Sequence, residues 1–584
     1  MMPANTNTIP PLATGDTDLA RTTGRDDRLL AGFMIAWLLI NALQAVFLGI
    51  DGDEAYYWML SQNLQWGYFD HPPVVTALIR LGESFGHGPF FTRLGTILLS
   101  TFSIALVYKG LPVYLQKIKW FLLLYAATLV FNVYAFITTP DAALFFFAAL
   151  FFWRYKLFLN KNSFSNSLWL ALAITGMFYS KYHGILLVGF VVLSNLRLFA
   201  NKYFWLIVLV VTLLFLPHLY WQYSNDWPTV RFHLIERIAK KYRINYTTDY
   251  LLGQILIWGP LISLLFYAAV FKLKIRDKLM RAHLFMFAGT LLFFLLSSFK
   301  NTVEPHWTMI AGISYVALFL SLIINGSATF QRLFFKFACS NIGLILLARI
   351  LFLIPNGPAN LIKHFRSFSY ARTWADAVYQ KAAGTPVVFS NSYALPSLYK
   401  FYHPDVQTIG YNDKGYRKTN FNIADDHFLQ GKDTYYYTQN PYLKPGTGIA
   451  VETIYNPGRL LPLPRYQSVN KLRIALKDPV KEMLPAGIRT VTLQISNRGN
   501  TGLQLNGRLR LDYAFLIEKY RFINSDSSFA LPQKTLQPGA SIRLSIPVKA
   551  PQKPGKYRLL FSFTNDFIPG NFASNFYAVD VHKN

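Results

Sequence analysis

The first apolar stretch of the chain, residues 30–57, reads LAGFMIAWLLINALQAVFLGIDGDEAYY. A helix needs about 20 apolar residues to cross the hydrocarbon core of a membrane, and residues 30–50 meet this length. The stretch begins too far into the chain to be a cleaved signal peptide, and it contains no small-residue cleavage site. It therefore predicts a membrane span that places Asp53 and Glu54 at the membrane surface.

Further apolar stretches follow throughout the first part of the chain. The 584 residues are 53% hydrophobic and 17% aromatic, and the apolar residues crowd into residues 30–354. This content exceeds that of an ordinary globular protein. Eleven spans are predicted, at about 30–50, 90–108, 120–137, 141–158, 167–181, 183–200, 203–221, 250–271, 282–298, 306–325 and 333–354.

The loops between the spans predict their orientation. Lys and Arg concentrate in cytoplasmic loops of membrane proteins, and here they fall in alternate loops: Lys109, Lys117, Lys119, Arg154, Lys156, Lys161, Arg197, Lys202, Lys272, Lys274, Arg276, Lys278, Arg281, Arg332 and Lys336. The polar tail 1–29 is then cytoplasmic and disordered, and an odd number of spans places the C-terminal part outside. The loop 222–249 breaks the pattern, so either the topology is wrong there or its cations bind an anion.

The formal net charge of +28 does not indicate a nucleic-acid-binding protein. Much of the excess lies in the short loops that set membrane orientation, and the rest is scattered without a basic helix or an aromatic–basic motif. Cys339 is the only cysteine, so no internal disulfide can form. The exported part must therefore fold on its apolar core.

The C-terminal part predicts two water-soluble domains. Residues 360–460 contain a helical pattern at 370–383, a strand at 385–390 and a second helix at 394–402, which favours a small α/β domain. Residues 463–584 contain short alternating segments separated by turns, which favours an Ig-like β-sandwich. These segments are 471–476, 489–495, 508–515, 541–548 and 556–563. The sandwich shows no catalytic cluster and is interpreted as a passive spacer or a carbohydrate-facing module.

The first outer loop gathers acids, aromatic rings and an imidazole. Asp53 and Glu54 are followed by Tyr56 and Tyr57, and Tyr68-Phe69-Asp70-His71-Pro72-Pro73 comes next. Acids directly after a span can have no role beyond that of a helix cap, and the neighbouring residues are what favour a functional role here. The aromatic residues suit the membrane interface or stacking on a sugar, and the two prolines stiffen the backbone that carries the imidazole.

Other polar groups fall at the outer ends of predicted spans. Asp141 follows Pro140 and can cap a helix, but its short turn should bring it to the same surface as Asp53. Lys181, His183, Lys300, Glu304 and His306 also lie at span ends, where ionisable groups either serve function or reach water. A divalent metal bound by Asp70, His71, His233 and His306 is a weaker hypothesis, because their spacing is not that of helix ligands.

These elements together resemble the GT-C membrane glycosyltransferases, specifically the superfamily of protein mannosyltransferases and lipid A aminoarabinose transferases. The resemblance rests on the Asp53-Glu54 pair, Tyr68–Pro72, the T-P-D-A turn (139–142), the S-K-Y-H-G segment (180–184) and His306-Trp307. It covers residues 30–355 well, the α/β segment loosely and the sandwich not at all. His71 stands where the aminoarabinose transferases carry Lys, so any grip on a phosphate would be weaker and pH-dependent.

The resemblance implies transfer of a sugar from a polyprenyl-phosphate carrier to an acceptor, with inversion at the anomeric carbon. Asp53 would be the catalytic base and Asp141 the second acid. A phosphate leaving group needs cations rather than an acid catalyst, and the candidates are His71, Arg237, Lys240 and Lys300. Supporting or sugar-binding roles fall to Glu54, Tyr56, Tyr57, Asp70, Lys181 and His306.

Two other functions stay open at this point. A flippase or transporter of a lipid-linked sugar would carry polar groups at mid-membrane, whereas here they cluster at the outer ends. A non-enzymatic envelope scaffold would leave the outer acids replaceable. The expected location is a bacterial inner membrane, with membrane lipids, a polyprenyl-phosphate sugar and a lipid, glycan or protein acceptor as partners.

Overall fold

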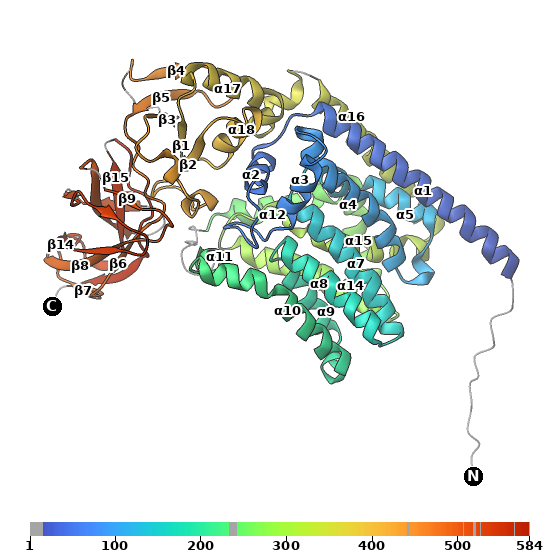
Figure 1. Cartoon of the computed structure of the whole chain (residues 1–584). Coiled ribbons are helices and arrows are strands. Elements are labelled where there is room, and N and C mark those ends of the chain that lie inside the picture. Colours follow the sequence, from blue (N-terminus) through green and yellow to red (C-terminus); the bar gives the residue numbers. More distant parts are fainter. Residues whose placement is uncertain are drawn as a thin grey trace, which may run out of the picture.

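The computed structural model describes residues 16–232, 242–354, 356–440, 444, 446–505, 507–517, 521–525, 527–565 and 567–582. Its first part is helical (Figure 1). The helices are α1 (Asp16–Phe47), α2 (Gly52–Ser61), α3 (Val74–Glu83), α4 (Pro89–Gly110), α5 (Ile118–Ala127), α6 (Leu129–Val133), α7 (Pro140–Asn160), α8 (Phe164–Ser180), α9 (Gly184–Ser194), α10 (Lys202–Ser224), α11 (Pro228–Arg231), α12 (Ile244–Ile257), α13 (Pro260–Ala269), α14 (Lys278–Ser298), α15 (Gly312–Asn325) and α16 (Ala328–Leu353). Short 3₁₀ segments include η5 (Pro305–Ala311).

Seven helices among the described residues are long and apolar enough to cross a membrane, or eight if the bent pair α12–α13 is one span. They lie in α1, α4, α7, α10, α14, η5–α15 and α16. The predicted spans at 120–137, 167–181 and 183–200 fall on the shorter helices α5, α8 and α9. The multispan fold is therefore confirmed, while the count of eleven spans stays a prediction.

The break between α12 and α13 has a local cause. The two helices are bent by 103° at Gly259 and Pro260. Gly259 adopts a left-handed φ of +99°, and an added Cβ would lie 2.3 Å from the Asn341 side-chain nitrogen and 2.7 Å from the Ala127 carbonyl oxygen. Pro260 then starts α13, where its missing N–H costs no helical hydrogen bond. A turn of this kind needs glycine.

The α/β domain packs against the end of the helical bundle where α1 ends (Figure 1). Its helices are α17 (Arg366–Ala382) and α18 (Ala394–Tyr402). Its five-stranded sheet has the order β2-β1-β3-β5-β4, with β1 parallel to β2 and β3 and antiparallel pairing elsewhere. The strands are β1 (Val387–Ser390), β2 (Thr408–Tyr411), β3 (Thr434–Thr438), β4 (Ile449–Val451) and β5 (Gly458–Leu463).

The C-terminal part is all β. A sheet of order β11-β10-β15-β16-β7, with β12 beside β10, accompanies a three-stranded sheet β14-β8-β6 and the pair β13-β9. The strands are β6 (Leu472–Leu476), β7 (Glu482–Met483), β8 (Ile488–Asn497), β9 (Leu503–Gln504), β10 (Leu509–Ile517), β11 (Arg521–Asn524), β12 (Phe529–Ala530), β13 (Thr535–Leu536), β14 (Ser541–Lys549), β15 (Gly555–Asn565) and β16 (Tyr577–Val581). Five of them overlap the predicted segments.

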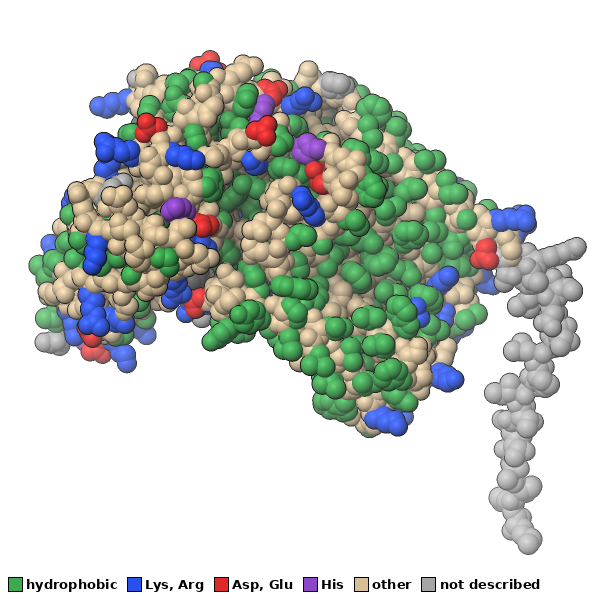
Figure 2. Space-filling model, viewed as in Figure 1, with side chains coloured by type: hydrophobic (Ala, Val, Ile, Leu, Met, Phe, Trp, Pro, Cys, Tyr) green, Lys and Arg blue, Asp and Glu red, His purple; other side chains and the backbone are tan. Residues whose placement is uncertain are grey.

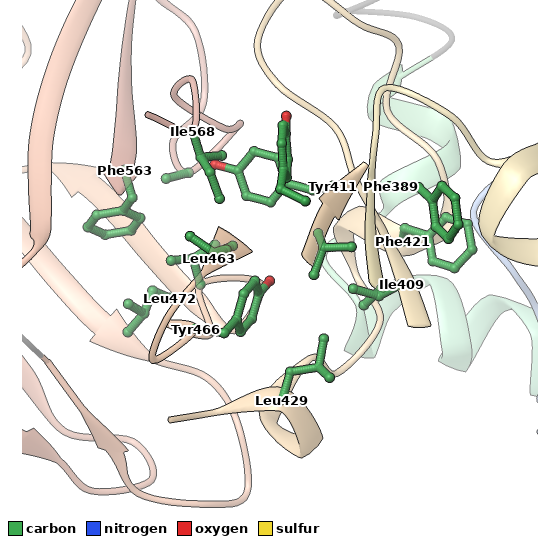
Figure 3. Packing of buried hydrophobic residues seen from close by; sticks show 14 of the residues in the cluster. Phe389, Ile409, Tyr411, Phe421, Leu429, Leu463, Tyr466, Leu472, Phe563 and Ile568 are labelled. Atoms are coloured by element: carbon green, nitrogen blue, oxygen red, sulfur yellow. The ribbon is translucent and has the colours of Figure 1, made fainter. Parts of the chain in front are cut away.

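Two large apolar cores organise the chain. One lies among the membrane helices and includes Phe121, Tyr315 and Phe319. The other runs without interruption from α2 and α3 through the α/β domain into the sandwich. Figure 3 shows the part of this second core between Ile409 of β2 and Phe563 of β15. Figure 2 shows hydrophobic side chains over the helical surface, with most charges on the C-terminal part.

Gly49 tests how tightly the end of α1 fits the α/β domain. A Cβ on Gly49 would lie 2.2 Å from the backbone oxygen of Phe368 in α17, and a backbone atom cannot yield cheaply. We expect Gly49→Ala to lower the free energy of unfolding by about 1–3 kcal/mol through overpacking. The loss of stability is measured by thermal unfolding of the detergent-purified chain, monitored by tryptophan fluorescence.

Gly32→Ala is the matched control for this substitution. Gly32 lies within α1, and an added Cβ would meet nothing within 4 Å. This substitution should leave the unfolding temperature unchanged or raise it slightly, because alanine favours the helix. Equal effects of the two substitutions would contradict the close approach at Gly49.

Candidate active site

The first turn of α2, which carries Asp53 and Glu54, is capped by side chains of the same turn. Asp51 is the N-cap residue, and its carboxylate accepts a hydrogen bond from the Asp53 amide at 3.0 Å. The Glu54 carboxylate in turn accepts one from the Asp51 amide at 3.2 Å, which completes a capping box. Such reciprocal caps satisfy free amides at a helix start. The first turn therefore has a fixed geometry, with Asp53 and Glu54 on different sides of it.

Glu54 is buried in an ion pair with Arg93 of α4. Arg93 Nε and Nη2 donate to the two carboxylate oxygens at 2.8 and 2.5 Å, and neither side chain is exposed. Arg93 also donates to the carbonyls of Leu48 and Gly49, both at 2.7 Å, and Glu54 accepts from the Thr138 amide at 2.8 Å. Glu54 is fully buried and thus holds the first turn of α2 in place.

Asp53 is exposed on the opposite side of the turn. The hydroxyl of Tyr393, which comes from the α/β domain, donates to its carboxylate at 2.7 Å. Although the side chain still reaches solvent, the surrounding protein reduces the hydration of its carboxylate. This loss of hydration and the negative charge of Asp51 raise the pKa of Asp53 to about 6, against the opposing effects of the Tyr393 hydrogen bond and the Arg417 charge. A carboxylate with a pKa near neutrality is suited to accept a proton.

Asp70 is fixed by two partners from opposite sides. Arg417 Nη1 of the α/β domain donates to one carboxylate oxygen at 2.7 Å, and the Tyr56 hydroxyl donates to the other at 2.7 Å. The Arg417 guanidinium also lies over the ring of Tyr393, 4.5 Å from its centroid. Arg417 and Tyr393 therefore connect Asp70 with Asp53.

Asp141 stands at the start of α7, just after Pro140, and it is buried. Lys181 Nζ, at the end of α8, donates to both of its carboxylate oxygens at 2.9 and 2.8 Å. His306 of η5 places Nε2 at 3.9 Å from the same carboxylate. The T-P-D-A turn, the S-K-Y-H-G segment and His306 of the His-Trp pair thus meet at one point, although they lie far apart in the sequence.

The negative charges of Asp53, Asp70 and Asp141 all act on the phenol of Tyr57. Burial raises the pKa of Tyr57 well above its usual value, and the negative charges of Asp53, Asp70 and Asp141 raise it further. The His71 ring lies against the Tyr57 ring, with centroids 5.9 Å apart. Tyr56 packs against Tyr393 and Phe421. Tyr56 and Tyr57 are therefore buried around the acids rather than arranged as an open aromatic stripe.

The candidate phosphate-binding cations are less well placed. His71 is half-buried beside Tyr57, whereas Lys300 is exposed just beyond α14 and makes no side-chain contact with the acids within the described parts of the chain. Arg237, Lys240 and His233 lie outside the described residues. Within the described ranges, no group of three His, Cys, Asp or Glu side chains is arranged to hold a metal ion.

Three residues of this site were not singled out from the sequence. Arg93 carried a usable signal, since it is a charge inside the predicted span 90–108. Tyr393 and Arg417 gave no local signal, because their partners Asp53 and Asp70 are 340 and 347 residues away in the chain.

Known proteins resemble this chain in sequence over one segment and in fold over most of its length. Residues 70–221 match the family described as dolichyl-phosphate-mannose-protein mannosyltransferase. Two crystal structures of ArnT from Cupriavidus metallidurans share the fold. The apo form has a TM-score of 0.56 and 13% identity, covering 74% of this chain and 98% of that one. The form bound to undecaprenyl phosphate has a TM-score of 0.52 and 14% identity, covering 74% and 97%. No curated protein matches the chain significantly.

The Glu54–Arg93 pair yields a stability prediction. Arg93→Met should cost about 3–5 kcal/mol, because it leaves a buried carboxylate without its partner. The double variant Glu54→Gln/Arg93→Met should recover part of that loss. Thermal unfolding of the purified variants measures the difference.

Arg80→Met is the control for removal of an arginine. Arg80 is exposed on α3 and contacts Gln62 at 3.4 Å. Its loss should change stability by less than about 0.5 kcal/mol. A double variant that is no more stable than Arg93→Met would refute a dominant cost from the unpaired carboxylate.

Proposed function

We propose that this chain, a membrane protein of the GT-C superfamily that includes protein mannosyltransferases and ArnT, transfers a sugar from a polyprenyl phosphate to an acceptor, with inversion at the anomeric carbon. The observation that carries the proposal is that the carboxylate of Asp53 and that of the buried Asp141–Lys181 pair both lie close enough to Tyr57 to act on its phenol. The ArnT structure with bound undecaprenyl phosphate supports a lipid phosphate as the carrier.

Asp53 has the properties expected of the base. In the proposed step the acceptor oxygen attacks the anomeric carbon, its proton passes to the Asp53 carboxylate, and the bond from that carbon to the phosphate oxygen breaks. The polyprenyl phosphate leaves as a stable anion, so an acid catalyst is not required. Tyr393 holds the carboxylate by a 2.7 Å hydrogen bond and so orients it for the proton transfer.

Asp141 and Lys181 serve a different role in this proposal. Their bidentate pair is buried, with the side chains 5% and 7% exposed. A buried pair of this kind fixes geometry more than it adds stability. We infer that Asp141 fixes the Lys181 ammonium and His306 near the leaving phosphate, where a cation offsets the developing charge. His71, Arg237, Lys240 and Lys300 remain the proposed further contacts of that phosphate.

The proposed location follows from the same chemistry. A donor anchored in the lipid allows sugar transfer on the outer face of a membrane, where nucleotide sugars are absent. Helix α2, which carries Asp53, lies beside the α/β domain at one end of the helical bundle (Figure 1). We therefore place the site on the extracytoplasmic face of a bacterial inner membrane.

Asp53→Asn tests the base assignment. The amide cannot accept the proton, so kcat for transfer from a labelled polyprenyl-phosphate sugar should fall about 10²–10⁴-fold. Asp376→Asn is the matched control, because Asp376 is an acid of α17 that pairs with His403, away from the site. Retention of full activity by Asp53→Asn would remove the assignment.

The pH profile of the parent protein gives an independent check. A base must be deprotonated to act, and the pKa of Asp53 is raised to about 6. We expect kcat/KM to be level above this pH and to fall about tenfold per pH unit below it. A profile that stays flat down to about pH 4.5, near an unperturbed carboxyl, would argue against Asp53.

A further inference from the structure

We propose that the C-terminal β-sandwich is a positioning element of the acidic site, acting through residues 411–420, which we call the bridging loop. The loop leaves the α/β domain after β2, crosses to the sandwich and returns to Asp70 and Tyr56. This inference revises the interpretation of the sandwich as a passive spacer. Its kinetic consequence rests on the proposed function, whereas its structural part does not.

The sandwich holds the first half of the bridging loop by backbone and side-chain contacts. The Tyr411 hydroxyl donates to the Pro569 carbonyl at 2.9 Å, and the Lys414 amide donates to the Gly570 carbonyl at 2.9 Å. Asp413 forms an antiparallel β-bridge with Asn571. These contacts fix the path of the backbone and do not depend on exposed side chains alone.

A largely buried ion pair reinforces the same junction. Lys414 Nζ lies 3.3 Å from Asp512 Oδ2 of β10, and the two side chains are only 11% and 16% exposed. Lys418 Nζ lies over the ring of Phe572, 5.2 Å from its centroid. Ion pairs that are shielded from water are screened less by salt than surface pairs. The junction therefore restrains the loop along its length.

The link between the two domains is itself rigid. The buried carboxylate of Asp426 accepts hydrogen bonds from the Tyr466 hydroxyl at 3.0 Å and from the Val469 amide at 3.1 Å, and it also bonds the Ser468 hydroxyl. The apolar core continues across this linker, as Figure 3 shows for Leu463 and Leu472. The sandwich therefore cannot swing freely relative to the α/β domain.

The second half of the bridging loop reaches the acids. Arg417 bonds Asp70 at 2.7 Å and covers the Tyr393 ring. The Asn420 amide donates to the Tyr56 hydroxyl at 2.8 Å, while its side-chain oxygen accepts from the Phe69 amide at 3.1 Å. One short segment thus links Asp512 in the sandwich with the groups that surround Asp53. Positioning of this kind matters because catalytic geometry tolerates only small displacements.

Hydrogen–deuterium exchange of the full chain in lipid nanodiscs tests the coupling without any substrate. Asp512→Asn should release the bridging loop, so amide exchange in residues 412–420 and in α2 should rise roughly tenfold. Lys414→Met removes the other partner and should act in the same way, which covers the case in which Asp512→Asn does not fold. Gln494→Ala is the matched control, because Gln494 lies on β8 of the sandwich and bonds the exposed Ser541.

Two outcomes would overturn the inference. One is unchanged exchange in the loop and α2 when either ion-pair partner is removed. The other is an equal rise in the Gln494→Ala variant, which would indicate general loosening of the sandwich. Since exchange needs no sugar donor, a parent protein that transfers no sugar would contradict the proposed function and leave this result standing.

A kinetic test of the same inference measures the pH dependence of kcat/KM in variants of Arg417. The groups acting on the Asp53 carboxylate are Asp51, Asp70, Tyr393 and Arg417, and the positive charge of Arg417 lowers its pKa. Arg417→Met should therefore move the acid limb of kcat/KM upward by about one pH unit. Arg417→Lys should restore part of the shift, and Asp512→Asn should move the limb in the same direction. An unmoved limb in Arg417→Met would refute the positioning role.

Discussion

The buried pair of Glu54 and Arg93 is the constraint on which the site depends. Removing two charges from water is costly, and the pair persists because Arg93 also bonds carbonyls at the end of α1 while Glu54 bonds amides in two separate turns. One ion pair thereby ties α1, α2, α4 and the turn before α7. With that junction fixed, Asp53 on α2 and Asp141 on α7 hold a set relation at the same end of the bundle.

The acids on and after α2 are also held by residues from outside the membrane helices. Tyr393 and Arg417 enter from the α/β domain and surround Asp53 and Asp70 with one hydroxyl and one guanidinium. The membrane helices therefore supply the Asp141–Lys181 pair, while the α/β domain sets the environment of Asp53. In the proposed reaction, proton transfer and charge stabilisation would thus be divided between two parts of the chain that have separate apolar cores.

Features that depend on a short stretch of sequence could be predicted, whereas contacts between residues far apart in the chain could not. Apolar length revealed the spans, and Pro140-Asp141 and Lys181 were visible because each sits at the end of a long apolar run. Glu54 was grouped with Asp53 because adjacency in sequence hides the fact that neighbouring helical residues face different ways. Arg417 was beyond reach, since only the folded chain brings it to Asp70. The short helices α5, α8 and α9 explain why length alone did not settle the number of spans.

The shared core of α2, α3 and the C-terminal domains has a consequence for biogenesis. Asp53 leaves the ribosome 340 residues before Tyr393, so α2 must wait, incompletely packed, until synthesis has passed Tyr393 and reached the C-terminal domains that share its core. Contacts this distant along the chain form slowly. The Asp53 carboxylate thus acquires its full surroundings only late in synthesis, and a chain that ends before Tyr393 would carry its membrane helices without the groups that surround Asp53.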